Sequence, residues 1–129
     1  MTNQVDLLIA TYRRPAALAV LLTSLCAQTF RDFRVVVSDQ SDESAFDAGE
    51  VLAALRLLRV HGHPLETHRH LPRRGLAEHR QFLLDRAQAP YALFLDDDLI
   101  LEPDAIARLV HAMERERCGF LGQAVIGLS

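Results

Sequence analysis

Apolar runs of strand length alternate along the whole chain with stretches in which apolar residues recur at the helical spacing. The strand-like runs cover residues 5–10, 33–38, 66–70, 91–95 and 119–126. The helix-like stretches cover residues 15–28, 46–58, 75–89 and 103–116. This alternation predicts an α/β fold, in which a mostly parallel sheet carries helices on both faces and right-handed crossovers join the strands.

Three consecutive aspartates, Asp96, Asp97 and Asp98, follow the most hydrophobic strand, YALFL. In open parallel sheets ligands bind beyond the carboxyl ends of the strands, and the aspartates lie at such an end. Carboxylates about 5 Å apart repel by roughly 3 kcal/mol per pair at an effective dielectric near 20, so a cation is a simple remedy. Oxygen ligands favour Mg²⁺ or Mn²⁺ over zinc. The alternative is a solvated loop that caps the helix starting near Pro103.

Other candidate polar residues lie at the ends of the first two strands and on the third helix. If strands one, two and four are neighbours, Thr11, Tyr12 and Asp39 converge with the aspartates on one rim. Asp39 is suited to accept hydrogen bonds from a base or ribose, or to close the strand in an Asx-turn. Tyr12 can stack on a base, or simply end a strand half-exposed. Arg80 can reach a base edge or a diphosphate, although an exposed helical arginine is the default expectation.

Composition and charge narrow the class of protein. The formal net charge of −3 argues against a nucleic-acid binder, and the longest apolar run is too short for a membrane span. Cys26 and Cys118 make no disulfide framework, which indicates a cytosolic protein with reduced thiols. The length of 129 residues suits one domain.

Arginine and histidine are distributed unusually. All 14 basic residues are arginine, and four of them lie within twelve residues that hold one acid, namely Arg69, Arg73, Arg74 and Arg80. This cluster suits phosphate binding, but codon bias also explains it. Five of the six histidines lie between residues 61 and 79, namely His61, His63, His68, His70 and His79. Polar surface is favoured over a metal site there, because no cysteine lies nearby and Glu66 alone offers a carboxylate.

Two blocks of the sequence resemble family 2 glycosyltransferases of the GT-A fold. LLIATYRRPAALAVLLTSLCAQTFRDFRVVVSDQSD (7–42) is similar to their opening, and RGLAEHRQFLLDRAQAPYALFLDDDLILEPDAI (74–106) to their second block with its DxD motif. The resemblance implies a Rossmann-like three-layer sandwich and a metal-dependent transfer of sugar from a nucleoside-diphosphate donor, a UDP-sugar foremost, to an unknown acceptor.

The resemblance also assigns site residues. Those expected to bind nucleotide are Thr11, Tyr12, Arg14, Asp39, Arg80, Asp96 and Asp97. Asp98, together with Asp96, is expected to bind Mg²⁺ or Mn²⁺, which would offset charge on the departing nucleoside diphosphate. The chain departs from the family at His79 and Gln81, which replace a small residue and an asparagine, and at Gln40, which follows Asp39.

Family members ordinarily continue for another hundred residues or more, with the acceptor site and, in inverting members, the general base. We therefore expect the sequence to stop before the acceptor half and the catalytic base to lie outside it. An apolar edge over residues 119–128 would then favour a homodimer. Two rival functions remain open: a nucleotidyltransferase, although TYRRP lacks that class's glycines, and a non-catalytic nucleotide or metal-binding module.

Overall fold

The computed structural model describes residues 3–116, which form four strands, four α-helices and one 3₁₀ turn. The strands are β1 (Val5–Thr11), β2 (Phe33–Asp39), β3 (Leu65–Arg69) and β4 (Tyr91–Asp96). The helices are α1 (Pro15–Leu25), α2 (Gly49–Val60), α3 (Leu76–Leu84) and α4 (Ala105–Glu116), and η1 (Ala45–Asp47) precedes α2. Within these residues, the predicted alternation of strands and helices is confirmed.

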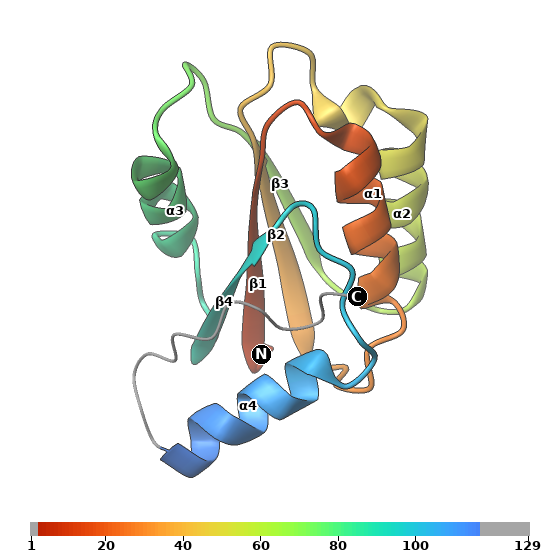
Figure 1. Cartoon of the computed structure of the whole chain (residues 1–129), viewed down its shortest axis with the longest axis vertical. Helices are drawn as coiled ribbons and strands as arrows, with labels where there is room; N and C mark the ends of the chain where they lie inside the picture. The colour runs from red at the N-terminus through yellow and green to blue at the C-terminus, as the bar shows by residue number, and fades with distance from the viewer. Residues whose placement is uncertain (1–2, 117–129) are drawn as a thin grey trace.

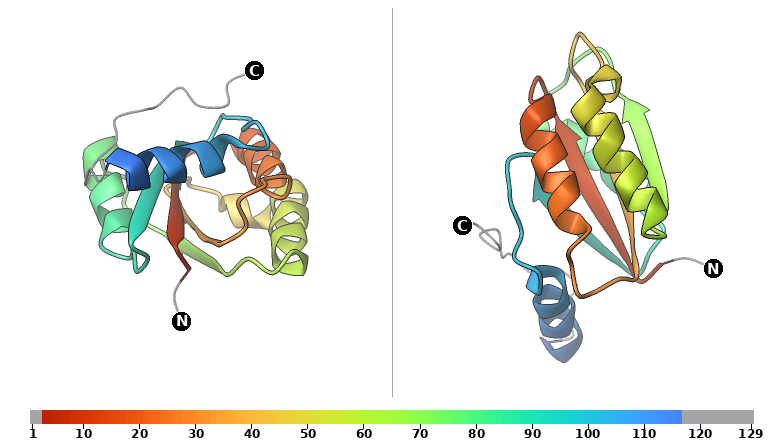
Figure 2. Two further views of the ribbon diagram at one scale, coloured as in Figure 1. Left: turned by 90° about the horizontal axis from the view of Figure 1, so that it is seen from below. Right: turned by 90° about the vertical axis from the view of Figure 1, so that its right-hand side faces the viewer.

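The four strands form one sheet in the order β3-β2-β1-β4, and every pairing is parallel. Strands one, two and four are therefore neighbours, which meets the condition for their polar residues to converge. Helices α1 and α2 lie side by side on one face of the sheet, and α3 lies on the other (Figures 1 and 2). The carboxyl ends of β1, β2 and β4 thus meet at the same edge.

The hydrophobic core lies on both faces of the two central strands, β1 and β2. Val5, Leu7 and Ile9 of β1 point into a large cluster beneath α1 and α2, whereas Leu8 joins Val36 and Leu83 beneath α3. Because parallel central strands are covered on both faces, they read as continuous apolar runs rather than alternating ones. Fully burying one such side chain stabilises the fold by about 1.5–3 kcal/mol.

Helix α4 lies across the amino-terminal end of the sheet (Figures 1 and 2). Helix α1 ends at Leu25 rather than at residue 28. Gln28 leaves the helix because its buried side chain donates to the Glu102 carbonyl at 2.7 Å and accepts from the Ile106 N–H at 3.2 Å. This residue therefore fixes the start of α4, which begins at Ala105 instead of residue 103.

Two other helices also differ from their predicted bounds. The segment predicted to be helical from residue 46 opens as η1, because the Ser44 hydroxyl accepts from the Phe46 N–H and Ala48 is extended. The third helix ends at Leu84 rather than continuing toward residue 89. The chain turns there because the N–H groups of Gln88 and Ala89 donate to Asp6.

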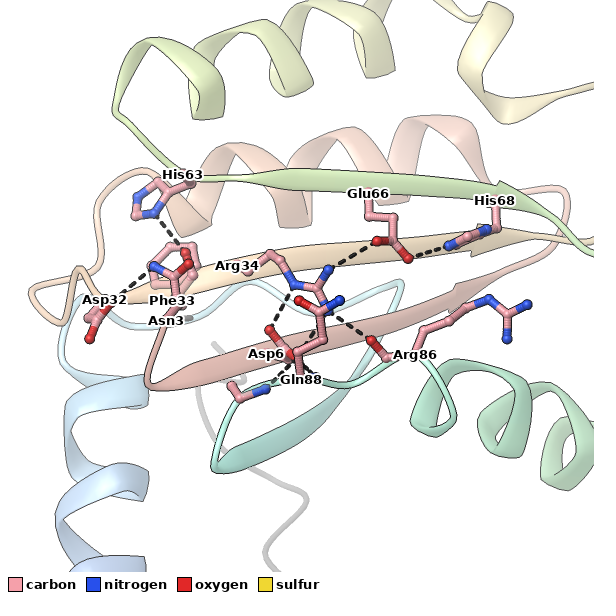
Figure 3. A network of polar contacts seen from close by, with 11 residues as sticks. Asn3, Asp6, Asp32, Phe33, Arg34, His63, Glu66, His68, Arg86 and Gln88 are labelled. Atoms are coloured by element: carbon pink, nitrogen blue, oxygen red, sulfur yellow. Dashed lines mark hydrogen bonds and ion pairs between the residues drawn. The ribbon is translucent and has the colours of Figure 1, made fainter. Parts of the chain in front are cut away.

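A polar network joins three strands and the end of this turn on the α3 face of the sheet (Figure 3). Arg34 forms a bidentate pair with Asp6, at 2.9 and 3.1 Å, and donates to Glu66 at 3.0 Å. Its guanidinium also donates to the Arg86 carbonyl at 2.9 Å. The Asp6 side chain is buried, and although burial alone would raise its pKa, the bonds from Arg34 and the two backbone N–H groups lower it below the ordinary value.

Three expectations fall on residues outside the described range. They are the strand at 119–126, the apolar edge at 119–128 and the reduced thiol of Cys118. Within residues 3–116, no helix is long and apolar enough to cross a membrane.

Candidate functional site

A cavity of about 370 Å³ opens at the carboxyl end of the sheet, between the ends of β1 and β4 and the start of α3. The residues that line it are Ala10, Thr11, Tyr12, Arg14, Gln40, Arg73, Arg74, Leu76, His79, Asp96, Asp97 and Asp98. The volume is within the range of small-molecule sites. Carboxylates and guanidinium groups from three separate segments thus face one space.

Asp97 is the buried member of the three aspartates. Its carboxylate accepts a hydrogen bond from the Thr11 hydroxyl at 2.9 Å and from the Arg14 guanidinium at 3.2 Å. Burial raises the pKa of this carboxyl, and the bonds from Thr11 and Arg14 oppose that rise. Asp97 therefore ties the turn after β4 to the end of β1.

Asp96 and Asp98 are more exposed, with 60% and 56% of their side chains accessible. Asp96 lies 3.5 Å from an Arg80 guanidinium nitrogen, and Asp98 lies 3.3 Å from Arg14. Such exposed ion pairs contribute about 0–1 kcal/mol each to stability, so a ligand that binds the carboxylates more strongly can displace the arginines. The outer two aspartates are the ones available to a ligand.

The carboxylate oxygens at the cavity are suitable ligands for a hard divalent cation whose remaining coordination positions are filled by substrate phosphates and water. In residues 3–116, no group of three or more histidine, cysteine, aspartate or glutamate side chains could hold a metal ion. Mg²⁺ is ordinarily bound through one or two protein carboxylates together with substrate phosphates and water. Asp96 and Asp98, both accessible at the cavity, provide that smaller donor set.

Asp39 is fully buried, and the loop that follows β2 uses both of its oxygens. Its Oδ1 accepts from the N–H and the hydroxyl of Ser41, at 2.9 and 2.6 Å, and its Oδ2 accepts from the Ala45 N–H at 2.7 Å. Arg69 lies 3.5 Å from Oδ2. This is the Asx-turn alternative raised from the sequence, and the Asp39 side chain does not line the cavity.

Tyr12 carries two arginines near its ring. The Arg73 guanidinium carbon lies 3.9 Å from the ring centroid, and that of Arg13 lies 5.0 Å away. Arginine is attracted to the face of an aromatic ring at such distances. The Tyr12 ring and the Arg73 guanidinium thus form a planar, positively charged part of the cavity wall.

The histidine cluster is structural in its contacts. His79 is buried and pairs with the Ser38 hydroxyl at 2.7 Å, and its ring stacks with that of His70. Burial, with a smaller contribution from His70, lowers the pKa of His79 to about 4. His63 stacks on Phe33, and His68 pairs with Glu66. The expected polar surface is therefore wrong for His63 and His79, of which only 4% and 3% is exposed, because both rings pack inside the fold.

Six of the residues proposed for the site line the cavity, namely Thr11, Tyr12, Arg14, Asp96, Asp97 and Asp98. Arg80 reaches the cavity only through Asp96, and Asp39 lies in the adjoining loop. Sequence reasoning left out Arg73 and Arg74, although both belong to the arginine cluster it had noted. Leu76, which is 58% exposed, adds an apolar side chain to the cavity wall.

Several solved structures superpose on most of this chain. TarS from S. aureus superposes with a TM-score of 0.70 at 21% identity, over 91% of this chain and 20% of TarS. Residues 1–349 of TarS in complex with UDP-GlcNAc give 0.71 at 21%, over 97% and 37%. The mannosyltransferase PcManGT from Pyrobaculum calidifontis, in complex with GDP-Man and Mn²⁺, gives 0.70 at 19%, over 88% and 33%.

These likenesses show the GT-A fold. The chain spans between about a fifth and two fifths of the length of these proteins. No curated protein matches the sequence at a significant level. Residues 6–127, nearly the whole chain, match the family described as Glycosyl transferase family 2. The chain therefore belongs to glycosyl transferase family 2, as its two sequence blocks indicated.

Proposed function

We propose that this chain forms the donor-binding part of a metal-dependent glycosyltransferase that takes a nucleoside-diphosphate sugar, with a UDP-sugar as the first candidate. The observation that carries the proposal is the convergence of Asp96, Asp98 and the three arginines Arg14, Arg73 and Arg74 on one cavity. Carboxylates suit a divalent cation, and guanidinium groups suit phosphate oxygens. Solved structures of this fold are described as complexes with UDP, UDP-GlcNAc and GDP-Man, and one of them contains Mn²⁺.

In this proposal Asp98 and Asp96 hold Mg²⁺ or Mn²⁺ against the donor diphosphate. Such a cation acts as a Lewis acid that stabilises negative charge on a leaving nucleoside diphosphate. Arg14 and Arg80 keep the two carboxylates oriented before the donor binds, and Tyr12 offers its ring to the nucleotide. Thr11 and Asp97 hold the turn in place, and Asp39 shapes the loop beside it. We place the protein in the cytosol, which rests on its use of cysteine.

A thermal melt with nucleotide and metal tests the binding half of the proposal. A ligand at a hundred times its Kd adds about 2.7 kcal/mol of stability, which shifts Tm on the order of 10 °C in a domain of this size. We expect a shift with Mn²⁺ plus UDP or GDP that exceeds the shifts with either component alone. Asp98→Ala should abolish the metal-dependent part, whereas Asp104→Ala, an exposed acid at the start of α4, should leave it intact. A shift that survives Asp98→Ala removes the acidic motif from the site.

Product analysis tests the reaction class. Release of a nucleoside diphosphate from a nucleotide sugar supports glycosyl transfer or donor hydrolysis. Release of pyrophosphate from a nucleoside triphosphate supports a nucleotidyltransferase instead. Binding without either product from this chain supports a donor-binding module instead.

A further inference from the structure

Gln40, which departs from the family pattern, forms a two-point contact with another segment of the chain. It follows the last residue of β2, and its backbone N–H donates to the Thr11 carbonyl at 3.1 Å. With its amide oriented by its hydrogen bonds, the side-chain oxygen accepts from the Arg74 N–H at 3.1 Å and the nitrogen donates to the Arg74 carbonyl at 3.0 Å. Only 3% of the residue is exposed, so water competes weakly for this amide–peptide pair.

The pair fixes the segment that carries the two arginines of the cavity. This arginine segment, residues 71–75, runs between β3 and α3. At its start the His70 N–H donates to the Asp39 carbonyl, and at its end the Gly75 carbonyl accepts from His79 within the first turn of α3. Between these two hydrogen bonds, the Gln40 side chain binds the backbone of the segment at Arg74.

The position of Arg73 depends on that backbone. Its guanidinium lies over the Tyr12 ring, although the residue itself is exposed and joined to the fold through an irregular segment. Holding an arginine side chain in one arrangement costs rotamer freedom, and an unfixed backbone would add to that cost. Because Gln40 holds the backbone at the neighbouring Arg74, less conformational entropy is lost when the Arg73 guanidinium packs on the Tyr12 ring.

We propose that Gln40 is a positioning residue of the donor site, which holds the arginine segment so that Arg73 lies against Tyr12 and meets the diphosphate of the nucleotide. This inference rests on the proposed function and deepens it. Arg73 is the residue that touches the ligand, and Gln40 acts through it. The planar guanidinium suits two phosphate oxygens at once, provided that its plane is held in advance.

The test replaces Gln40 by methionine, which is similar in length but makes neither hydrogen bond. The matched control is Gln88→Met, because Gln88 is exposed and lies on the turn after α3, outside the cavity. Titration calorimetry of UDP in the presence of Mn²⁺ should show about tenfold weaker binding for Gln40→Met and unchanged binding for Gln88→Met. An unchanged affinity for Gln40→Met overturns the positioning role without affecting the proposed function.

A double-mutant cycle separates positioning from a general loss of stability. In an Arg73→Ala background, Gln40→Met should change UDP affinity less than twofold, because the residue it positions is gone. If the two effects instead multiply, Gln40 does not act through Arg73 and the proposal fails.

Hydrogen exchange of the Arg74 amide gives a measurement that needs no ligand. We expect this amide to exchange at least tenfold faster in Gln40→Met than in the wild type, with Gln88→Met unchanged. Equal exchange rates overturn the amide–peptide pair itself. If the wild type binds no nucleotide, the proposed function fails, and with it the role of Gln40 in nucleotide binding. Slow exchange of the Arg74 amide in the wild type would then show that the Gln40–Arg74 pair itself is present, so that the error lies in the proposed function.

Discussion

Thr11 and Asp97 lie 86 positions apart in the sequence and are joined by a buried hydrogen bond of 2.9 Å. Thr11 is the last residue of β1, and Asp97 is the first residue after β4. Because β1 and β4 are parallel neighbours, their carboxyl ends meet at the same edge of the sheet. The bond fixes the aspartate turn against the central strand and leaves Asp96 and Asp98 exposed beside the cavity.

We predict that Thr11→Val destabilises the chain although the two side chains have nearly the same shape. The substitution leaves the buried Asp97 carboxylate without one of its donors, which costs about 1–3 kcal/mol. Urea unfolding at neutral pH measures this loss. Thr67→Val, at an exposed position of β3, should change the free energy of unfolding by less than about 0.5 kcal/mol. Equal stability of Thr11→Val and the wild type would show that Asp97 does not depend on the hydroxyl.

We predict that Asp39 stabilises the loop after β2 more than it contributes to ligand affinity. Asp39→Ala leaves the N–H groups of Ser41 and Ala45 without their acceptor, so a loss on the order of 3 kcal/mol is expected. Chemical denaturation reports the loss, and calorimetry at a temperature where the variant is folded reports UDP affinity. A stable variant that no longer binds UDP would instead assign Asp39 to direct contact with the base.

Acid should destabilise the chain through His79. The unfolded chain takes up a proton near the ordinary histidine pKa of 6.5, whereas burial keeps the folded His79 neutral down to about 4. Folding stability that His79 contributes near neutral pH is therefore lost as the pH falls from 6.5 to 4, by about 3 kcal/mol in all. Unfolding free energies measured across this range should fall less steeply for His79→Gln than for the wild type. His61→Gln, at an exposed position, should keep the wild-type slope.

Arg34→Met should be among the most destabilising single changes on the α3 face of the sheet. It leaves the Asp6 carboxylate, with 1% of its side chain exposed, without its bidentate partner. Breaking a buried pair from one side costs about 3–5 kcal/mol. Arg108→Met removes an arginine with two exposed carboxylate partners and should cost less than about 1 kcal/mol.

Thermal unfolding of both variants checks this contrast, and a similar loss in each would contradict it. The pH dependence of the free energy of unfolding gives a second check of the Asp6–Arg34 pair, because the pKa of Asp6 is lowered in the folded protein. The stability that the Asp6 carboxylate contributes is present above its ordinary pKa of 3.8 and is lost as the pH falls below that value.

The sequence by itself determined the order of the strands and helices, the parallel sheet and the end of the sheet at which polar residues gather. The elements follow from local periodicity, which the sequence displays directly, and the parallel sheet follows from the general rules for connections between alternating strands and helices. The aspartates after YALFL, for example, had to lie at a carboxyl end once that run was a strand.

Only the tertiary structure decided which polar residues face the cavity. Asp97 is buried because Thr11 and Arg14 lie against it, and Asp39 is used by its own loop because Ser41 and Ala45 reach back to it. Helix ends were decided in the same way, as when Gln28 leaves α1 to bind the start of α4. The physical reason is that a carboxylate or amide takes whichever donors surround it, and those donors come from segments that the sequence does not place together.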